Sequence, residues 1–155
     1  MPPYNILILN GPNLHALGIR QPDIYGTAGL DAIPGMVAHV LGQRAQQVAL
    51  HLYHNNSEGA LIDRLELARE EGCHGIVVNA GAYTHTSLAI ADCLAWIQIP
   101  AVEVHVSNVF ARHEAIRRKS FLAAHVIGVI SGFGVFGYAL AVQALLEHVT
   151  AQTRP

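Results

Sequence analysis

The sequence has 155 residues and a formal net charge of −2, and 52% of its residues are hydrophobic while only 13% are charged. A chain of about 150 residues can bury roughly 70% of its unfolded surface, so we expect one domain over residues 1–150 and a tail over 151–155. The charge argues against nucleic acid or an anionic membrane as a bulk partner. The low charged fraction predicts apolar surface that other subunits cover.

The cysteines and the N-terminal residues indicate the compartment. Cys73 and Cys93 form no Cys-x-x-Cys pair, which favours two inert thiols over a disulfide. The first residues lack the basic region of a signal peptide, and the apolar run 6–9 is far too short to span a membrane. We therefore expect a cytoplasmic protein.

The chain opens with the aliphatic run 6–9, which is typical of a strand buried on both faces of a parallel sheet. About sixteen residues then pass before a credible helix, and connections of that length tend to be lids or binding loops. We expect 14–26 to form a mobile cover. Its Arg20 and Tyr25 suggest a tyrosinate base, because a guanidinium lowers a phenol pKa that is otherwise about 10. The alternative is a surface loop in which Tyr25 packs down and Arg20 is solvated.

The rest of the chain alternates strand-like and helix-like patterns. Asp31 is expected to cap a helix that runs to about residue 46. Further strands are expected at 48–53, 75–79, 101–106 and 126–130. Helices are expected at 57–72, from the 80–86 loop to 97, and at 137–149, with a basic amphipathic turn at 112–119.

Five strands separated by helices predict the α/β class, with right-handed crossovers and helices on both faces of a parallel sheet. Doubly wound five-stranded sheets commonly take the strand order 2-1-3-4-5, and ligands then bind at the carboxyl ends of the first and third strands. Three expected strands end in polar residues, so the sequence predicts a small-molecule site there. These residues are Asn10, Asn13, Asn79, Thr84, His85, Glu103, His105, Ser107 and Asn108.

Several of these polar residues also have simpler interpretations. Glu103 and His105 share one face of a strand, so the carboxylate can orient the imidazole, but a satisfied half-buried histidine gives the same pattern. The ten histidines show no metal-ligand spacing, so we expect no metal site. The basic run 117–119 is by default a solvated helix face.

The glycine run 132–137 matches Gly-x-Gly-x-x-Gly and raises the alternative of a non-catalytic nucleotide-binding module. A dinucleotide fingerprint needs a further strand, whereas only eighteen residues follow Gly137. We therefore interpret the run as a tight turn with close helix packing. A phosphoacceptor receiver would need acidic residues where this chain has Asn10 and Asn79.

Several motifs, in order, resemble the type II 3-dehydroquinate dehydratases. The motifs are Leu9-Asn10-Gly11-Pro12-Asn13-Leu14, Leu17-Gly18 with Arg20, Ile24-Tyr25-Gly26, Asn79 to Ser87, Glu103 to Asn108, Gly128 to Gly134 and Gly137-Tyr138. The resemblance implies a flavodoxin-like fold, no cofactor, and a homo-dodecamer built as a tetramer of trimers. It also implies a lyase that dehydrates 3-dehydroquinate to 3-dehydroshikimate by anti elimination, a step toward chorismate and the aromatic amino acids.

The resemblance also assigns roles to residues. Tyr25 would remove the C2 proton, Arg20 would lower its pKa, and Asn13 would hold a water that stabilises the enolate. His105, supported by Glu103, would protonate the departing C1 hydroxyl. The substrate-binding groups would be Asn79, His85, Ser107, the backbone at Val106 and an arginine, with Asp92 reaching a neighbouring subunit's site.

The chain departs from the family pattern at its two arginines. The family spaces them four residues apart, whereas Arg112 and Arg117 are five apart. At about 100° per residue, a regular helix would turn the second arginine roughly 140° from the first. Either a local bulge absorbs the insertion or one arginine faces solvent, and we expect Arg117 to keep the substrate contact.

Overall fold

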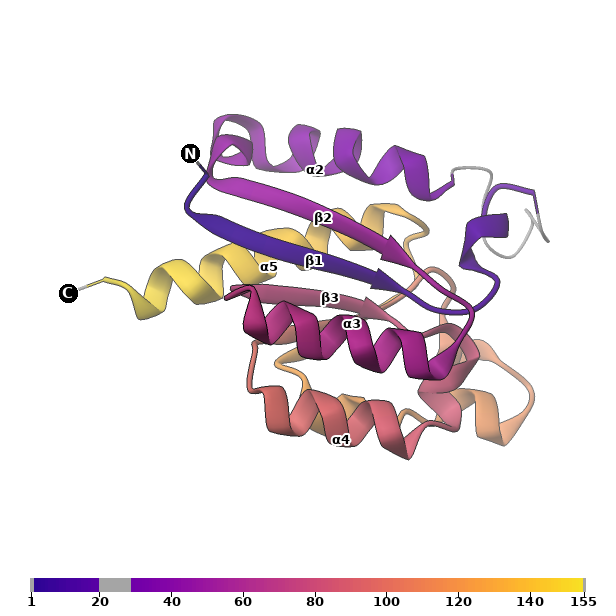
Figure 1. Ribbon diagram of the computed structural model, residues 1–155. Helices are drawn as coiled ribbons and strands as arrows, with labels where there is room; N and C mark the ends of the chain where they lie inside the picture. Colours follow the sequence, from indigo (N-terminus) through magenta and orange to yellow (C-terminus); the bar gives the residue numbers. More distant parts are fainter. Residues whose placement is uncertain (1, 20–28, 155) are drawn as a thin grey trace.

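The computed structural model describes residues 2–19 and 29–154. Arg20 and Tyr25, with the rest of the expected cover from residue 20 onward, lie outside the described residues. The five strands form one parallel sheet in the order β2-β1-β3-β4-β5, which confirms the predicted order (Figure 1). The strands are β1 (Tyr4–Asn10), β2 (Val48–His54), β3 (Gly75–Asn79), β4 (Ala101–His105) and β5 (Gly128–Ser131).

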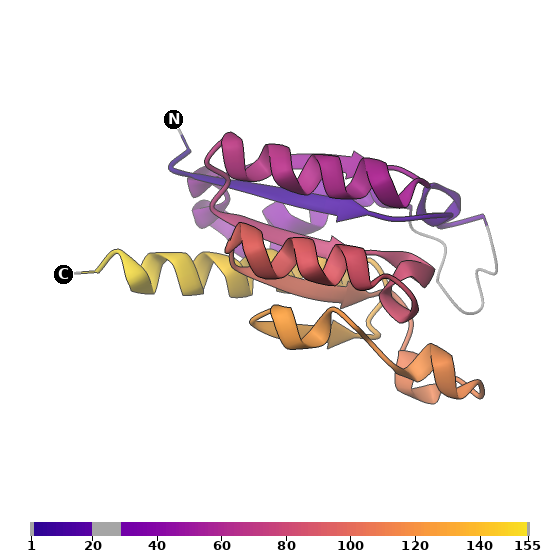
Figure 2. The ribbon, with the colours of Figure 1, turned by 60° about the horizontal axis from the view of Figure 1, so that its bottom comes forward.

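Among the described residues, four α-helices cover the sheet in two layers. They are α2 (Ile33–Leu41), α3 (Glu58–Glu70), α4 (Leu88–Ile97) and α5 (Phe136–Gln152). Helices α2 and α5 pack on one face, and α3 and α4 pack on the other (Figures 1 and 2). The arrangement is the flavodoxin-like α/β fold.

Strand β1 is buried between the two helix layers and contributes to the core on each face of the sheet. Ile6 and Ile8 belong to the core beneath α2 and α5, whereas Leu7 and Leu9 belong to the core beneath α3 and α4. All four side chains have no exposed surface. Alternate residues of a strand point to opposite faces, so an unbroken aliphatic run is what a doubly covered strand requires.

The helix termini follow the expected chemistry except at α2. Ser57 caps α3 by accepting a hydrogen bond from the Ala60 N–H, and Gly72 follows that helix with φ +69°. The expected cap at Asp31 is wrong. Asp31 lies inside a 3₁₀ turn, Leu30–Ala32, so its backbone does not have the extended conformation of a capping residue, and α2 begins after Ala32.

Other boundaries also differ from expectation. Helix α2 ends at Leu41 and a 3₁₀ segment, Gly42–Gln47, continues to β2. Helix α5 reaches Gln152. The segment expected as an amphipathic turn at 112–119 contains no α-helix: it follows one 3₁₀ turn, Val109–Ala111, and contains another, Ala115–Arg118.

The glycine run forms the tight turn that was predicted. Gly132, Phe133 and Gly134 all have positive φ, at +95°, +68° and +61°. The N–H of Gly132 donates to the carbonyls of His105 and Ser107, and the N–H of Gly134 donates to the Val106 carbonyl. The turn therefore uses two of its N–H groups to hold the end of β4.

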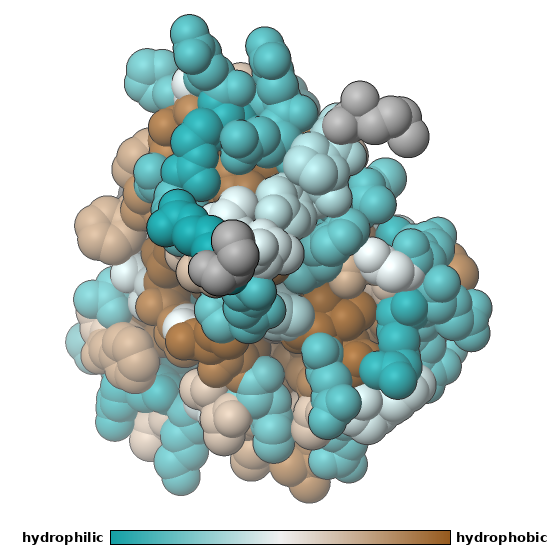
Figure 3. Space-filling view, turned by 90° about the vertical axis from the view of Figure 1, so that its left-hand side faces the viewer, coloured by the Kyte–Doolittle hydropathy of each residue, from teal (hydrophilic) through white to brown (hydrophobic). Residues whose placement is uncertain are grey.

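The molecular surface carries both polar and apolar side chains. The end of the molecule at which the termini lie is largely polar with apolar areas between (Figure 3). Most of the large exposed hydrophobic side chains lie between Phe110 and Phe136, on and around the edge strand β5. Within residues 2–19 and 29–154, no helix is long and apolar enough to cross a membrane.

Candidate active site

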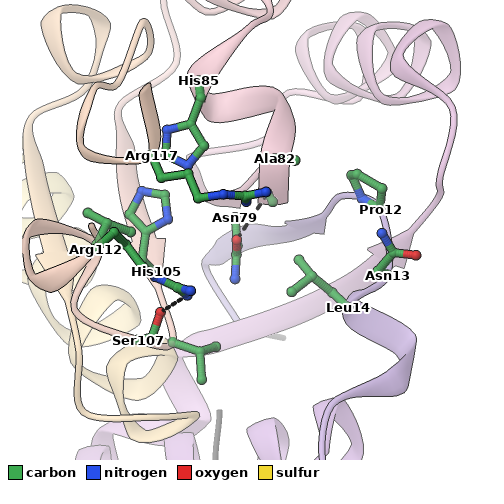
Figure 4. Close-up of a pocket in the computed structure, with 13 residues that line it drawn as sticks. Pro12, Asn13, Leu14, Asn79, Ala82, His85, His105, Ser107, Arg112 and Arg117 are labelled. Atoms are coloured by element: carbon green, nitrogen blue, oxygen red, sulfur yellow. Dashed lines mark hydrogen bonds between the residues drawn. The ribbon is translucent and has the colours of Figure 1, made fainter. Parts of the chain in front are cut away.

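A pocket opens at the carboxyl ends of β1, β3 and β4, where the sequence predicts it (Figure 4). Its lining combines two histidines, two arginines, two asparagines and a serine with a few apolar groups. The lining residues are Pro12, Asn13, Leu14, Asn79, Gly81, Ala82, His85, His105, Val106, Ser107, Val109, Arg112 and Arg117. The pocket therefore offers both cations and neutral hydrogen-bonding groups to one small polar ligand.

Glu103 and His105 form a buried acid–base pair on β4. The His105 Nε2 lies 2.6 Å from the Glu103 Oε2, and the two residues are 6% and 1% exposed. When Glu103 is a carboxylate it can only accept, so His105 donates its Nε2–H and its Nδ1 is the ring nitrogen left for another partner. Such a pair can hold and deliver a proton.

His85 lies beside His105 with its ring nearly parallel, at 6.5 Å between centroids. Its Nδ1 is 2.5 Å from the carbonyl oxygen of Lys119. A carbonyl only accepts, so Nδ1 carries the proton and the neutral ring has its acceptor at Nε2. Two histidines from separate elements thus have defined tautomers at one wall of the pocket.

Asn79 is oriented by a buried tyrosine from α5. The Tyr138 hydroxyl accepts from Asn79 Nδ2 at 2.8 Å and donates to Asn10 Oδ1 at 2.6 Å. The Asn79 Oδ1 in turn accepts from the Gly81 N–H. Burial raises the pKa of Tyr138 above its ordinary value, although the hydrogen bond from Asn79 opposes this, so the hydroxyl stays neutral. Within the described part of the chain, the second Asn79 amide hydrogen has no partner and can bind a ligand.

Both arginines line the pocket, which agrees with the alternative that an irregular backbone absorbs the insertion. Figure 4 shows both guanidinium groups extending into the pocket from the same wall. The Arg112 Nη2 donates to the Ser107 Oγ at 2.6 Å, and the Arg117 Nε is 3.3 Å from the Glu114 Oε1. The 140° argument assumed a regular helix, and two short turns with a break between them do not obey that periodicity.

Hydrogen bonds from Arg118 fix the conformation of this irregular loop. Its Nη1 donates to the carbonyl oxygens of Arg112 and His113, at 2.8 and 2.9 Å. A single guanidinium thereby ties the second 3₁₀ turn back to the segment before it. Arg118 is therefore a structural clamp. The run 117–119 is exposed, as expected of a solvated face, but it lies on and just after a 3₁₀ turn and not on an α-helix.

Asn13 lies on the opposite rim of the pocket from the arginines (Figure 4). Its φ is +66°, in the left-handed region that asparagine tolerates, and its N–H donates to the Asn56 Oδ1. His15, in the next turn, has its ring 5.0 Å from that of His54. Burial and the nearby His15 lower the pKa of His54, which favours the neutral state of His54.

The structure does not bring every predicted site residue together. Val106 and Ser107 line the pocket with the residues above, whereas Asp92 is exposed on α4 and is not part of this lining. Arg20 and Tyr25 lie outside the described residues. Within the part of the chain that the structure describes, no group of three or more histidine, cysteine or acidic residues could hold a metal ion.

Three functional contributors were not identified from the sequence: Tyr138, Arg118 and Ser120. Ser120 donates to the Glu103 Oε1 at 2.6 Å. The sequence signals for them are weak: Tyr138 belongs to one of the family motifs, and Arg118 lies in the basic run 117–119. Tyr138 and Ser120 act through hydrogen bonds to groups distant in sequence, which no local pattern encodes. Arg118 contacts residues five and six positions away across an irregular loop, which helical periodicity does not describe.

Comparisons with known proteins give one consistent result. A family model described as class II dehydroquinase matches residues 4–146. A protein of Acaryochloris marina named 3-dehydroquinate dehydratase is 48% identical over 150 residues, covering 96% of this chain and 97% of its own. A catabolic 3-dehydroquinase of Clavispora lusitaniae is 46% identical over 143 residues, covering 92% of this chain and 97% of its own. The crystal structure of type II dehydroquinase from Butyrivibrio crossotus aligns with a TM-score of 0.85 at 40% identity, covering 92% of this chain and 97% of that one.

Proposed function

This chain belongs to the class II dehydroquinase family, and from that premise we propose that it removes water from 3-dehydroquinate through an enolate to give 3-dehydroshikimate. The observation that carries the proposal is the convergence on one pocket of the His105–Glu103 pair, Asn79 and two arginines. The enzyme class follows from the family, while the order of proton transfers and the residue roles are the proposal.

The proposed reaction has two proton transfers. A base removes the proton from C2, and the electron pair moves onto the carbonyl oxygen to form the enolate. The enolate then expels the C1 hydroxyl, which takes a proton from His105 and leaves as water. Tyr25 is the proposed base, and Arg20 is proposed to lower the pKa of its hydroxyl. This assignment rests on the family resemblance, because both residues lie outside the described residues.

The pocket suits a substrate that carries a carboxylate and several hydroxyls. The Arg112 and Arg117 guanidinium groups supply positive charge, and Asn79, His85 and Ser107 supply neutral donors and acceptors. Negative charge develops on the enolate oxygen, so fixed hydrogen-bond donors aimed at that oxygen lower the barrier. Asn13, through a bound water, is the proposed enolate partner.

The proposed cellular role is in the shikimate pathway, toward chorismate and the aromatic amino acids, in the cytoplasm. Relatives carry both the general name and the name catabolic 3-dehydroquinase, so one reaction serves both uses in this family.

A direct assay tests the proposal. Purified protein mixed with 3-dehydroquinate should generate the ultraviolet absorbance of the conjugated enone in 3-dehydroshikimate. A protein that binds a nucleotide tightly and yields no enone would instead support the module alternative. His105→Ala serves as the matched control, because its enone signal should fall steeply if the product arises at this pocket.

Replacing Lys119 with alanine should leave turnover nearly unchanged. Lys119 is the only lysine in the chain, so a Schiff-base mechanism would have to use its amine. Its side chain is not among the groups lining the pocket, and its contact to His85 uses the backbone carbonyl, which alanine retains. Steady-state kinetics of Lys119→Ala measures this directly. Borohydride trapping of substrate on Lys119 would overturn the enolate mechanism.

The site is proposed to be completed by a neighbouring subunit within a dodecamer. Asp92 is exposed on α4, and hydrophobic side chains around β5 are exposed in the single chain. Asp92→Ala should weaken substrate binding, and mixed oligomers of Asp92→Ala and His105→Ala chains should regain activity, because some sites then combine two intact residues. Sedimentation should give about twelve chains. Mixed oligomers no more active than the separate variants, or a fully active monomer, would exclude the shared site.

A further inference from the structure

The contacts of Ser120 define which way its hydroxyl donates. The Ser120 Oγ accepts from the N–H groups of Leu122 and Ala123, at 3.1 and 3.0 Å. Backbone N–H groups can only donate, so both acceptor positions of the hydroxyl are occupied. Its single hydrogen is therefore directed to the third partner, the Glu103 Oε1, at 2.6 Å.

Glu103 is consequently held at both oxygens. Its Oε1 accepts from Ser120, and its Oε2 faces the His105 Nε2 at 2.6 Å. Glu103 is 1% exposed, so solvent does not substitute for a lost partner. With both contacts made, the carboxylate cannot rotate about its last torsion, which is otherwise a broad, soft degree of freedom.

We propose that Ser120 is a positioning residue that locks the Glu103 carboxylate so that His105 keeps its proton on Nε2. The proposal deepens the proposed function: in the protonated ring Nδ1 carries the second proton, which it would deliver to the departing hydroxyl, and the ring then returns to the neutral form with its proton on Nε2. Without the Ser120 hydrogen, the carboxylate can turn away from Nε2 and the alternative tautomer of His105 becomes accessible.

Lys119, which precedes Ser120 in the chain, positions the second histidine of the pocket, His85. The Lys119 carbonyl fixes the His85 tautomer, so two consecutive residues of one connection set both rings. Among the described residues that line the small cavity around Glu103 and His105, the other titratable side chains are His85, Arg118 and Lys119. Glu103 is the only acidic group in that lining, and therefore the only carboxylate there that can orient His105.

The test compares Ser120→Ala with two matched variants. Ser120→Thr keeps the hydroxyl and should retain near-normal kinetics. Ser87→Ala removes another buried serine hydroxyl that caps a helix, where it accepts from the Ile90 N–H at 2.9 Å. Within residues 2–19 and 29–154, Ser87 makes no hydrogen bond to a carboxylate. Losing a hydrogen bond to a charged group typically changes an equilibrium constant by about tenfold or more. Ser120→Ala should thus lower kcat roughly tenfold with KM changed less than about twofold, while Ser87→Ala leaves kcat unchanged.

The decisive readout does not depend on activity. Nitrogen-15 NMR of neutral His105 should show the Nε2–H tautomer in the wild-type chain and in Ser120→Thr and Ser87→Ala, and a substantial Nδ1–H fraction in Ser120→Ala. If Ser120→Ala fails to fold, Ser120→Cys is the substitute, because a thiol is similar in size but is a weak hydrogen-bond donor. It should also raise the fraction of His105 with its proton on Nδ1. An unchanged tautomer and kcat would overturn the proposal. A tautomer shift in a protein without dehydratase activity would instead leave the positioning intact and refute the proposed function.

Discussion

Replacing His105 with alanine should lower kcat by at least ~10², the usual scale for losing a general acid. His105 is the only pocket histidine paired with a carboxylate in the described residues, through the 2.6 Å contact to Glu103. The KM should change much less, because the missing group acts on the departing hydroxyl in the transition state. Steady-state kinetics at several pH values measures both parameters.

Two further variants serve as comparisons for the kcat of His105→Ala. His39→Ala removes an exposed histidine from α2, away from the pocket lining, and should leave kcat unchanged. Tyr25→Phe should lower kcat by a similar ~10², since it would remove the proposed base. A near-normal kcat in His105→Ala would refute the acid role of His105, whereas a near-normal kcat in Tyr25→Phe alone would refute only the tyrosinate base.

Replacing Arg117 with alanine should raise KM by roughly tenfold or more, because a hydrogen bond to a charged group is typically worth about 1.5–3 kcal/mol. Arg112→Ala should raise KM by distinctly less. The structure gives a reason for this ranking. Arg112 already donates one Nη hydrogen to the Ser107 Oγ, whereas the ion pair that Arg117 makes with the exposed Glu114 uses its Nε.

The arginine series needs a control for lost surface charge. Arg44→Ala removes a guanidinium that pairs with the exposed Glu147, far from the pocket lining, and should leave KM unchanged. Arg117→Lys should not restore binding fully, because an ammonium lacks the planar fork of donors. A larger KM for Arg112→Ala than for Arg117→Ala would show that Arg112 makes the dominant substrate contact.

Much of the fold was determined by local sequence. The run 6–9 required a strand buried on both faces, and the alternation of strands and helices predicted the observed sheet order. Strand ends also placed Asn79 and His105 at one edge, because parallel strands bring their carboxyl ends together. The period of two put Glu103 and His105 on one face, which made their pairing foreseeable.

The tertiary structure alone decided how the site is held. The Tyr138 contact to Asn10 joins residues 128 apart in the chain, and the Ser120 contact to Glu103 joins residues 17 apart. Arg118 fixes a loop that is not a regular helix, so of the two alternatives for Arg112 and Arg117 the tertiary structure decided for the irregular backbone. Periodicity and capping rules describe regular elements, whereas the shape of an irregular loop depends on which distant donors and acceptors the folded chain brings to it.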